Sequence, residues 1–363
     1  MSSFACTPST EDLAKALGWV APVATDKQVE LFRNVLLTAD EQSQSLTLRA
    51  TDSVIAASAR VPATVRSSGS VSCPAVHLNK LVKSLSTVAF CDCHEKDGQL
   101  IVAAGRSKSK IPTYDRPSWP EWHGPSVSAF TAETGPLRDA LGWTLPSAAP
   151  DSASGLQGVI ILAEGGFLRM SVTDGRRAAR ATVPAPGSKK VSAFVLSPAA
   201  KRISTMARLT AKGPVHFDGD SKRLFFWNDE GLGCSCLLGS PKKFDFESTI
   251  PSRDFKHAIQ APREALLNAV TRGALTDPTK LLLTARGSEL TVIAASPKGG
   301  FEEALAVEGE GSFDLNLHPA YLGSFLQHLD SEEILLYYWD KHLPVLITAS
   351  GDDSLSGIMM QMR

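Results

Sequence analysis

Two pairs of cysteines have the spacing of potential metal ligands. Cys91 and Cys93 are followed directly by His94, and Cys234 and Cys236 form a second pair. A structural zinc site needs four such ligands that converge with tetrahedral geometry. Residues two apart on a β-strand instead share one face of that strand, and both pairs adjoin strand-like apolar runs. We therefore predict buried or half-buried thiols and no metal site.

Two aspartates could serve an enzyme as acid, base or ligand, with His94 as a further candidate. Asp52 and Asp174 each follow a threonine, and these two Thr-Asp steps are 122 residues apart, a spacing that recurs along the chain. A recurring Thr-Asp step suggests a structural turn. The sequence contains no phosphate-binding glycine-rich loop and no nucleophile elbow. We predict a non-catalytic protein without a cofactor, with an enzyme as the rival hypothesis.

The composition is that of an ordinary globular protein. The chain has 363 residues, of which 43% are apolar and 21% are charged, which suits two or three domains that each bury a core. The net charge of −1 means that nucleic acid could be bound only through a local basic surface. No run approaches the ~18 apolar residues that span a bilayer, and residues 1–12 lack the pattern of a signal peptide. With six cysteines, too few for a disulfide scaffold, we expect a cytoplasmic protein.

The elements that would position these residues recur along the chain. The tetrapeptide Ala-Leu-Gly-Trp occurs at 16–19 and again at 140–143, with a proline three residues later in both places. Strand-like runs recur in the same order at a spacing close to 122 residues, at 35–39 and 46–52, at 159–163 and 168–174, and at 281–285 and 290–296. Chance resemblance among alternating strands could explain one such match, but the common order and spacing indicate an internal repeat.

A helix belongs to each repeat as well. Residues 78–85 and 322–329 place apolar side chains at i, i+3, i+4 and i+7, the pattern of one buried helix face, and residues 203–209 occupy the middle position. Each unit is therefore predicted to contain two helices and a run of strands, which indicates an α+β fold with antiparallel sheets. We expect three domains of this kind, at residues 1–124, 125–250 and 251–363.

Basic residues gather on some of the predicted helices. The stretch 198–212 carries Lys201, Arg202, Arg208 and Lys212 without any acid, and 77–85 carries Lys80 and Lys83. Acidic residues are concentrated elsewhere, for example at 302–303 and 352–353. A single basic helix is usually a solvated face. If equivalent helices point the same way, however, their charges form one surface that suits phosphates without reading bases.

Three motifs resemble those of one known family. Residues 172–178, Val-Thr-Asp-Gly-Arg-Arg-Ala, resemble its Ala-Thr-Asp-Gly-His-Arg-Leu. Residues 105–113 resemble its Gly-Arg-Ser-Arg-Phe stretch, and residues 358–363 resemble its ending Val-Met-Pro-Met-Arg-Leu. By their order and spacing, the chain resembles the bacterial DNA polymerase III β sliding clamp family over nearly its whole length.

This resemblance implies three copies of one domain per chain and a head-to-tail dimer that forms a six-domain ring around double-stranded DNA. It implies a processivity factor that binds DNA without sequence preference and tethers the replicative polymerase, with the clamp loader and other clamp-binding-motif proteins as further partners. The implied DNA-facing residues are Lys27, Lys80, Lys83, Arg138, Lys201, Arg202, Arg208 and Lys212. The implied partner-peptide pocket consists of Leu156, Thr173, Gly175, Arg176, Arg177, Ala178, Phe244, Thr249, Ile358, Met360, Gln361, Met362 and Arg363. The implied dimer interface involves Ser109, Ile111 and Leu275.

The chain departs from the family pattern at several of these positions. Arg176 replaces a histidine and Ala178 replaces a leucine, which would enlarge the groove and alter the preferred peptide. Gln361 replaces a proline, the final leucine is missing, and Ser109 replaces an aromatic residue at the dimer interface. Such divergence would suit a clamp encoded by a phage or mobile element, or a distant bacterial one. A repeat scaffold that binds proteins only, without encircling DNA, is the alternative function.

Overall fold

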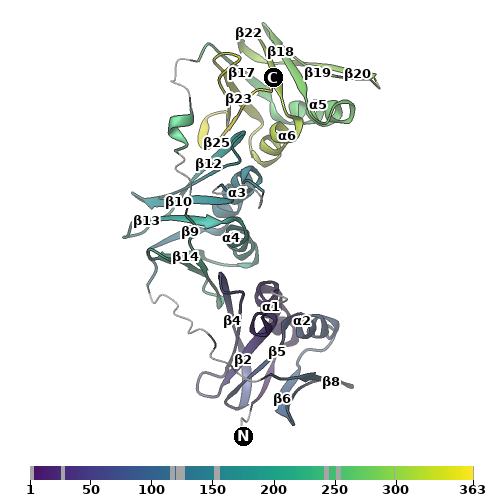
Figure 1. Cartoon of the computed structure of the whole chain (residues 1–363), viewed down its shortest axis with the longest axis vertical. Coiled ribbons are helices and arrows are strands. Elements are labelled where there is room, and N and C mark those ends of the chain that lie inside the picture. The colour runs from purple at the N-terminus through teal and green to yellow at the C-terminus, as the bar shows by residue number, and fades with distance from the viewer. Residues whose placement is uncertain are drawn as a thin grey trace. The chain divides into compact units, whose positions relative to one another are not determined.

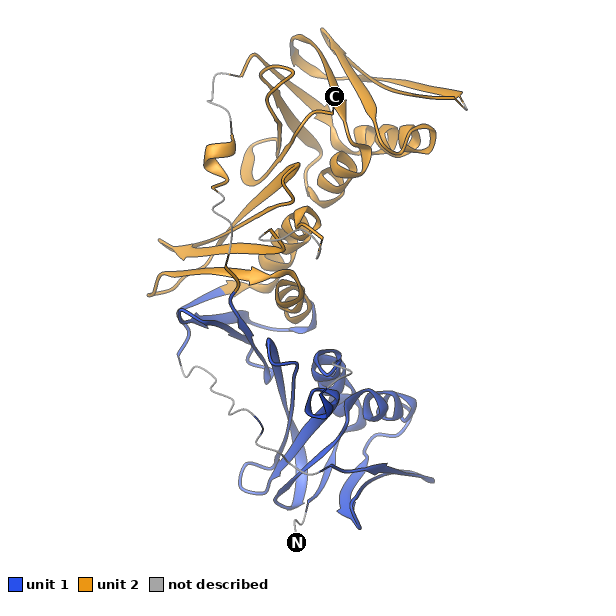
Figure 2. Ribbon diagram, in the orientation of Figure 1, with its two compact units in different colours: residues 1–131, 208–238 blue, residues 132–207, 239–363 orange. Residues whose placement is uncertain are grey.

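The computed structural model describes residues 4–25, 29–114, 119, 127–150, 156–240, 245–250, 255–297 and 299–362. The chain divides into two compact units, coloured separately in Figure 2. Unit 1 comprises residues 1–131 and 208–238, and unit 2 comprises residues 132–207 and 239–363. Of the residues predicted to be functional, Lys27, Phe244 and Arg363 lie outside the described residues. Within the described part, no helix is long and apolar enough to cross a membrane.

Unit 1 packs two helices against antiparallel strands. The helices are α1 (Thr10–Val20) and α2 (Ala75–Ser84). The strands are β1 (Ala5–Pro8), β2 (Asn34–Asp40), β3 (Ser45–Thr51), β4 (Ile55–Ser67), β5 (Gly69–Pro74), β6 (Asp92–Lys96), β7 (Gln99–Ala104), β8 (Ser107–Pro112), β14 (Pro214–Gly219), β15 (Arg223–Trp227) and β16 (Leu232–Leu237). Strand β9 (Phe130–Glu133) joins the same sheet, whose main path runs β8-β7-β6-β1-β4-β16-β15-β14-β9. Helices α1 and α2 lie side by side, α1 on β3 and β4 and α2 on β2 and β5 (Figure 1).

Unit 2 also packs helices against antiparallel strands, with more of each. Its helices are α3 (Thr134–Thr144), most of α4 (Ser197–Leu209), α5 (Arg263–Thr276) and α6 (Pro319–His328). Its strands are β10 (Gly158–Glu164), β11 (Phe167–Thr173), β12 (Arg177–Pro184), β13 (Val191–Leu196), β17 (His257–Pro262), β18 (Leu281–Arg286), β19 (Glu289–Ser296), β20 (Gly299–Ala306), β21 (Glu308–Glu310), β22 (Ser312–Leu317), β23 (Glu333–Tyr338), β24 (Val345–Ala349) and β25 (Asp352–Met359). They form one sheet in the order β13-β10-β11-β12-β25-β24-β23-β17-β21 and another in the order β20-β19-β18-β22. The predicted α+β fold with antiparallel sheets is confirmed.

The helices begin where the local sequence favours it. Ser9 caps α1 by accepting the amide hydrogen of Asp12, at 3.3 Å, which satisfies a donor that the first helical turn leaves free. Helix α6 starts at Pro319, whose missing N–H is no loss at that position. The apolar faces predicted for α2 and α6 are buried, with Leu78 and Val82 in α2 and Leu322, Phe325 and Leu326 in α6. Burial of these faces, at roughly 1.5–3 kcal/mol for each large side chain, holds the helices on the sheets.

The two repeated tryptophans occupy equivalent places. The indole Nε1 of Trp19 donates to the carbonyl oxygens of Ser58 (3.0 Å) and Gly233 (3.1 Å), which are partners across the β4–β16 pairing. The indole of Trp143 donates to the carbonyls of Arg180 (3.1 Å) and Ser356 (3.3 Å), which are partners across β12–β25. Each buried indole therefore ties together two strands that are far apart in the sequence.

Candidate functional site

The Thr-Asp steps form the same turn in both copies. The Thr173 hydroxyl donates to the Arg177 carbonyl (2.8 Å) and accepts the Gly175 amide hydrogen (3.0 Å). Asp174 Oδ1 accepts the amide hydrogens of Arg176 and Arg177, both at 2.9 Å. Gly175 adopts φ 86°, a left-handed conformation that glycine allows without strain. The predicted structural role of this step is confirmed.

The first copy repeats each of these bonds. Thr51 donates to the Ile55 carbonyl at 2.9 Å and accepts the Ser53 amide hydrogen at 3.1 Å. Asp52 Oδ1 accepts the amide hydrogens of Val54 (2.9 Å) and Ile55 (2.6 Å). In both aspartates, one carboxylate oxygen thus accepts two backbone hydrogen bonds, which argues against the catalytic role considered for them.

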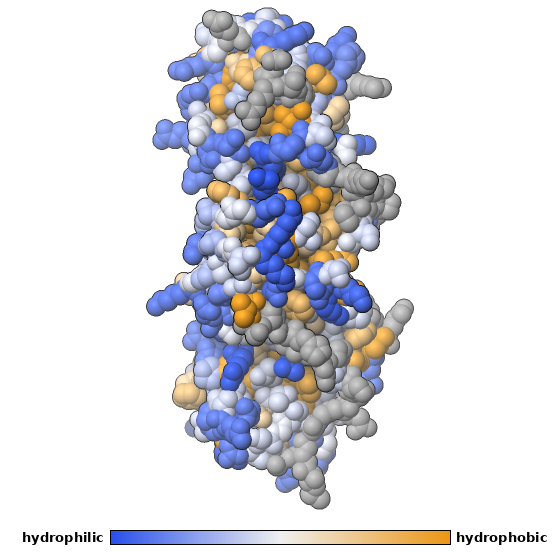
Figure 3. Space-filling view, turned by 90° about the vertical axis from the view of Figure 1, so that its left-hand side faces the viewer, coloured by the Kyte–Doolittle hydropathy of each residue, from blue (hydrophilic) through white to orange (hydrophobic). Residues whose placement is uncertain are grey.

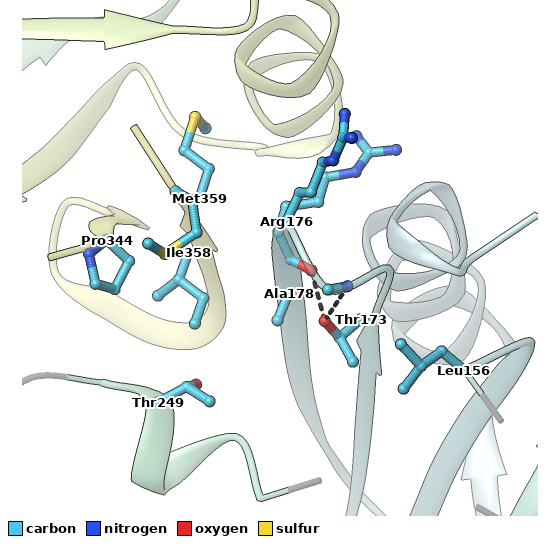
Figure 4. A pocket seen from close by; sticks show the side chains of 11 residues that line it. Leu156, Thr173, Arg176, Ala178, Thr249, Pro344, Ile358 and Met359 are labelled. Carbon is cyan, nitrogen blue, oxygen red and sulfur yellow. Dashed lines mark hydrogen bonds between the residues drawn. The ribbon is translucent and has the colours of Figure 1, made fainter. Parts of the chain in front are cut away.

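The second-copy turn borders a pocket in unit 2 with a volume of about 390 Å³. In Figure 4, Ile358 and Pro344 face Ala178 across the opening, Thr249 approaches from another segment, and Arg176 points away toward the rim. The base is apolar, because Ala178, Phe246 and Ile358 are buried against one another with Ile250 and Leu346 beside them. The lining residues are Leu156, Thr173, Gly175, Arg176, Arg177, Ala178, Thr249, Pro344, Ile358, Met359 and Met360.

Arg177 is fixed by three contacts, whereas Arg176 is exposed. Arg177 Nε pairs with Asp174 Oδ2 at 3.1 Å, an amino group donates to the Pro146 carbonyl, and the guanidinium lies 4.2 Å from the Tyr321 ring centroid. A guanidinium held between a carboxylate, a carbonyl and an aromatic face keeps one orientation. The Arg176 side chain is exposed at the rim, while its carbonyl accepts the Met360 amide hydrogen at 2.9 Å.

His318 lies next to this arginine pair. Its ring stacks on Tyr321 with centroids 4.4 Å apart, and its Nδ1 accepts the Ala320 amide hydrogen at 3.2 Å as the N-cap of α6. Burial, followed by the positive charges of Arg177 and Arg176, lowers the pKa of His318 below its ordinary value. The neutral imidazole therefore caps the helix beside the pocket.

The predicted C-terminal residues divide between lining and support. Ile358 and Met360 line the pocket, with Met360 46% exposed. Gln361 Nε2 instead donates to the carbonyls of Asp340 (2.7 Å) and Leu343 (3.1 Å), and the Met362 amide donates to the Asn316 carbonyl (2.8 Å). Sequence reasoning missed Pro344 and Met359. Met359 neighbours two predicted residues, but no sequence signal marks Pro344.

The predicted DNA-facing residues belong to both units. Lys80 and Lys83 on α2, together with Arg208 and Lys212, lie in unit 1, and Arg138, Lys201 and Arg202 lie in unit 2. The exposed residues are Lys80, Lys83, Lys201, Arg208 and Lys212, and none of their side chains forms an ion pair with a carboxylate among the described residues. Arg138 differs because its Nε contacts Asp139 at 3.1 Å.

Two of the three predicted dimer residues lie on an edge strand, and the third lies on a helix. Ser109 and Ile111 are on β8, which ends the sheet of unit 1, with Ser109 half-buried and Ile111 buried. Leu275, near the end of α5, is 85% exposed, an unusual degree for a leucine. Strand β20 ends the four-stranded sheet beside α5. Both units therefore offer an edge strand with unpaired backbone groups.

The cysteines are structural. All six are free and buried, as predicted, and Cys93 faces Cys6 across the β1–β6 pairing. Burial raises the pKa of Cys6, Cys73 and Cys236 to about 12, which keeps these thiols protonated. His94 Nδ1 contacts Asp92 Oδ2 at 2.8 Å. Among the described residues, no group of three or more His, Cys, Asp and Glu side chains could hold a metal ion.

The fold and motifs match proteins of one kind along the whole chain. Residues 4–123 match the family described as DNA polymerase III beta subunit, N-terminal domain. The beta sliding clamp of Pseudomonas putida KT2440 is 29% identical over 371 residues, covering 98% of this chain and 99% of that protein. The beta sliding clamp of Escherichia coli K12 is 25% identical over 370 residues, with the same coverage of 98% and 99%.

Solved structures agree. A DNA polymerase sliding clamp from Pseudomonas aeruginosa matches with a TM-score of 0.89 at 24% identity, covering 99% of this chain and 100% of that chain. The DNA polymerase III beta subunit of Thermotoga maritima matches with a TM-score of 0.91 at 19% identity and 99% coverage of both chains. These matches define a sliding-clamp fold. Over nearly its whole length, the chain is similar to bacterial DNA polymerase III beta sliding clamps.

Proposed function

We propose that this protein is a DNA sliding clamp, a non-catalytic processivity factor of the cytoplasm. Two copies would close head to tail around duplex DNA, each contributing the three domains 1–124, 125–250 and 251–363. We call a pairing between strands of successive repeats a junction. Two junctions form within the chain, by the pairings β4–β16 and β12–β25. The strands of a third, β20 and β8, lie at sheet edges, and the proposal depends above all on this difference. A second chain would close that junction twice, so that β8 and β20 of both chains would be paired.

The repeat supplies the register of the proposed junction. Ser58, Arg180 and Glu302 are counterparts, since each is the partner of the equivalent residue on the preceding strand of its hairpin. The register can be followed from strand to strand, starting at the strand that precedes the first helix. In unit 1 the path runs from β1 through β6 and β7 to Ser109 on β8. In unit 2 it runs from β17 through β23 and β24 to Gly357 on β25. The residues before them, Lys108 and Ser356, are therefore counterparts as well.

Ser356 pairs with Arg180 at the β12–β25 junction. By the same register, Lys108 of one copy would pair with Glu302 of the other. Both side chains are exposed, so their charges are available for an ion pair across the junction. Opposite charges directly across an antiparallel pair stabilise it modestly and fix its register.

The third junction would lack the indole that ties the other two. Counted from the buried leucines Leu13, Leu137 and Leu266, the place of Trp19 and Trp143 is taken by Arg272. Arg272 Nε contacts Glu303 Oε2 of its own chain at 2.8 Å. A junction held by edge strands, apolar contact at Leu275 and surface charge would open more readily than the two internal ones, and we propose that a clamp loader opens the ring there.

The pocket suits short linear peptides of partner proteins. Its base is apolar, exposed Met360 can adapt to different side chains, and Arg176 offers an exposed positive charge at the rim. We propose that the replicative polymerase, the clamp loader and other proteins with a clamp-binding motif dock here. A docked polymerase would stay near the DNA because the ring cannot leave it, which raises its effective concentration.

DNA contact would come from the exposed lysines and arginines of α2, α4 and the segment after α4. Such side chains contact phosphates and carry no base information. Weak contacts allow the protein to slide, because the closed ring around the DNA, and not the strength of the contacts, would keep the protein bound. Charge reversal at Lys80, Lys83 and Lys201 would lower retention on DNA if the protein is a clamp, and would leave partner binding unchanged if it is only a scaffold.

Topology itself provides the test. The protein is loaded on nicked circular DNA with its loader, isolated with the circle, and the DNA is then cut once. We expect the protein to remain on circles at a salt concentration that removes phosphate binding, and to leave within minutes once a free end exists. Equal retention on the linear product would contradict encirclement.

A further inference from the structure

A second hollow lies in unit 1, over the pairing of β4 with β16, and has a volume of about 250 Å³. Gly231 and Gly233 form part of its lining, Trp227 and Phe225 of β15 lie on one side, and Ser58 and Arg60 of β4 on the other. Figure 3 shows separate apolar patches among hydrophilic residues on the strand side of the molecule. Nothing in the proposed clamp mechanism uses this hollow.

Small residues create the hollow. Ser58 and Gly233 are register partners, and their counterparts in unit 2 are Arg180 and Ser356, where the second indole donates. Arg180 crosses that junction, with its amino group 3.3 Å from the Ser356 hydroxyl. Among the described residues, the same place in unit 1 holds only the hydroxymethyl group of Ser58 and the hydrogen atom of Gly233, and these two residues leave a hollow over the sheet.

One wall of the hollow is a prepared aromatic surface. The Trp227 ring stacks on His216 with centroids 5.5 Å apart and an interplanar angle of 15°. His216 is held in turn by its Nε2 contact with Asp229 Oδ1 at 3.0 Å. An indole supported from behind keeps its orientation, so a flat apolar group could pack against it at little entropic cost.

A half-buried arginine, Arg49, lies one strand away from the residues that line the hollow. Arg49 is the register partner of Ser58 and lies half-buried on the same face, with a buried Nε that has no hydrogen-bond partner among the described residues. Burial lowers the pKa of Arg49 from its ordinary value. Arg60 donates from Nε to the Ser45 hydroxyl at 3.0 Å. A buried donor without a partner is unfavourable, and a carboxylate that accepts from Arg49 Nε would satisfy it.

Unit 2 shows which groups cover such a surface. The Phe246 ring packs on Ala178 and Ile358, a register pair two residues along the β12–β25 pairing from Arg180 and Ser356, with the Arg180 guanidinium 5.3 Å from the ring centroid. The neighbouring Glu247 carboxylate forms an ion pair with Arg180. An aromatic residue followed by an acidic one therefore occupies this surface in the second copy.

We propose that the hollow between Ser58, Gly233 and Trp227 is a second docking site, which binds a partner segment where an aromatic residue precedes an acidic one. The ring would lie over the glycines against Trp227, and the carboxylate would reach Arg49. Strands β4, β16 and β15 are interior strands with both edges paired, so the segment cannot bind as an added strand. Recognition must come from these side chains.

The test uses the full chain labelled with 5-fluorotryptophan and fluorine NMR, with the Trp227 resonance assigned by Trp227→Phe. The probe is a short Gly/Ser peptide with one central Phe-Glu step. We expect a saturable shift of the Trp227 resonance, its loss with Ala in place of Phe, and about tenfold weaker binding with Gln in place of Glu, as expected for a lost charge-assisted hydrogen bond.

Two variants and one control complete the design. Ser58→Arg, which places the counterpart side chain in the hollow, should weaken binding at least tenfold. Arg49→Gln should weaken binding of the Glu peptide about tenfold but leave the Gln peptide unchanged, a coupling that a general loss of structure would not produce. Arg169→Gln, an exposed arginine on β11, should bind as the unaltered chain does.

Three results would overturn the proposal: no shift at Trp227, equal effects of Arg49→Gln on both peptides, or an effect of Arg169→Gln as large as that of Arg49→Gln. A single-stranded oligothymidylate that shifts Trp227 at lower concentration than the peptide, and depends on Arg49, would instead identify a nucleic-acid site. None of these results depends on whether the protein encircles DNA, so the two proposals fail separately.

Discussion

Reversal of the charge at Lys108 tests the proposed junction between two copies most directly. The repeat register places Lys108 opposite Glu302 of the partner subunit, through the counterpart pair Arg180–Ser356. A ring of two chains contains this junction twice. Lys108→Glu therefore removes two attractions and creates two repulsions between carboxylates.

The size of the effect follows from the exposure of both groups. An exposed ion pair contributes roughly 0.2–1 kcal/mol, and a like-charge pair costs a similar amount. Over two junctions the loss is about 1–4 kcal/mol, which raises the dimer dissociation constant roughly 5- to 1,000-fold. Sodium chloride should shrink the difference, because surface pairs are screened over about 8 Å at physiological ionic strength.

Sedimentation equilibrium over a concentration series measures this constant. The unaltered chain should approach twice its 38.7 kDa at lower concentration than Lys108→Glu. The double variant Lys108→Glu, Glu302→Lys restores opposite charges and should recover most of the loss. As a matched control, Lys189→Glu reverses an exposed lysine outside β8 and β20. If Lys108→Glu dimerises like the control, or the double variant dimerises more weakly than Lys108→Glu, the register is wrong.

Three further substitutions probe the site and its support. Trp143→Phe leaves the Arg180 and Ser356 carbonyls without their indole donor and should lower the free energy of unfolding by about 1–3 kcal/mol; urea unfolding measures it, and a change under 0.5 kcal/mol would contradict the role of the indole. Ala178→Leu inserts bulk beside buried Phe246 and Ile358, costing about 1–3 kcal/mol, and should weaken polymerase-peptide binding in calorimetry, whereas unchanged affinity would show that the peptide avoids this wall. The pKa of His318 is lowered in the folded chain, so its contribution to stability is present above the ordinary pKa and is lost as pH falls toward the folded pKa. His318→Asn keeps a capping side chain, and it should make the free energy of unfolding depend less on pH below pH ~6.5. An unaltered slope would refute this role of His318.

Local and repeated features were open to prediction from sequence. The apolar spacing of α2 and α6 identified both helices and their buried faces. The Thr-Asp steps indicated structural turns because they recur with the repeat, and both turns form the same hydrogen bonds. A local turn depends on a few consecutive residues, so its conformation is encoded where it occurs.

Pairings between distant strands were beyond such reasoning. The union of β4 with β16 joins residues that are more than 160 positions apart, and alternating strands look alike whichever partner they choose. For the same reason, the recurrence of Trp19 and Trp143 indicated a repeat but did not show which backbone carbonyls accept hydrogen bonds from the indoles. Pro344 could not be assigned to the pocket, because its place depends on how β24 lies beside β25.

The hollow beside Trp227 was hidden for a different reason. It depends on side chains that are small, Ser58 and Gly233, at places where the other copy has Arg180 and Ser356. Small residues in a strand give no functional signal alone, since glycine also marks bulges and close backbone approach. The register aligns the two junctions residue by residue. It shows that the first junction has a hollow at the place where the second junction has larger side chains. The strand register therefore allows each residue of one junction to be compared with its counterpart in the next. Positions where the two junctions differ indicate where a further binding function can lie.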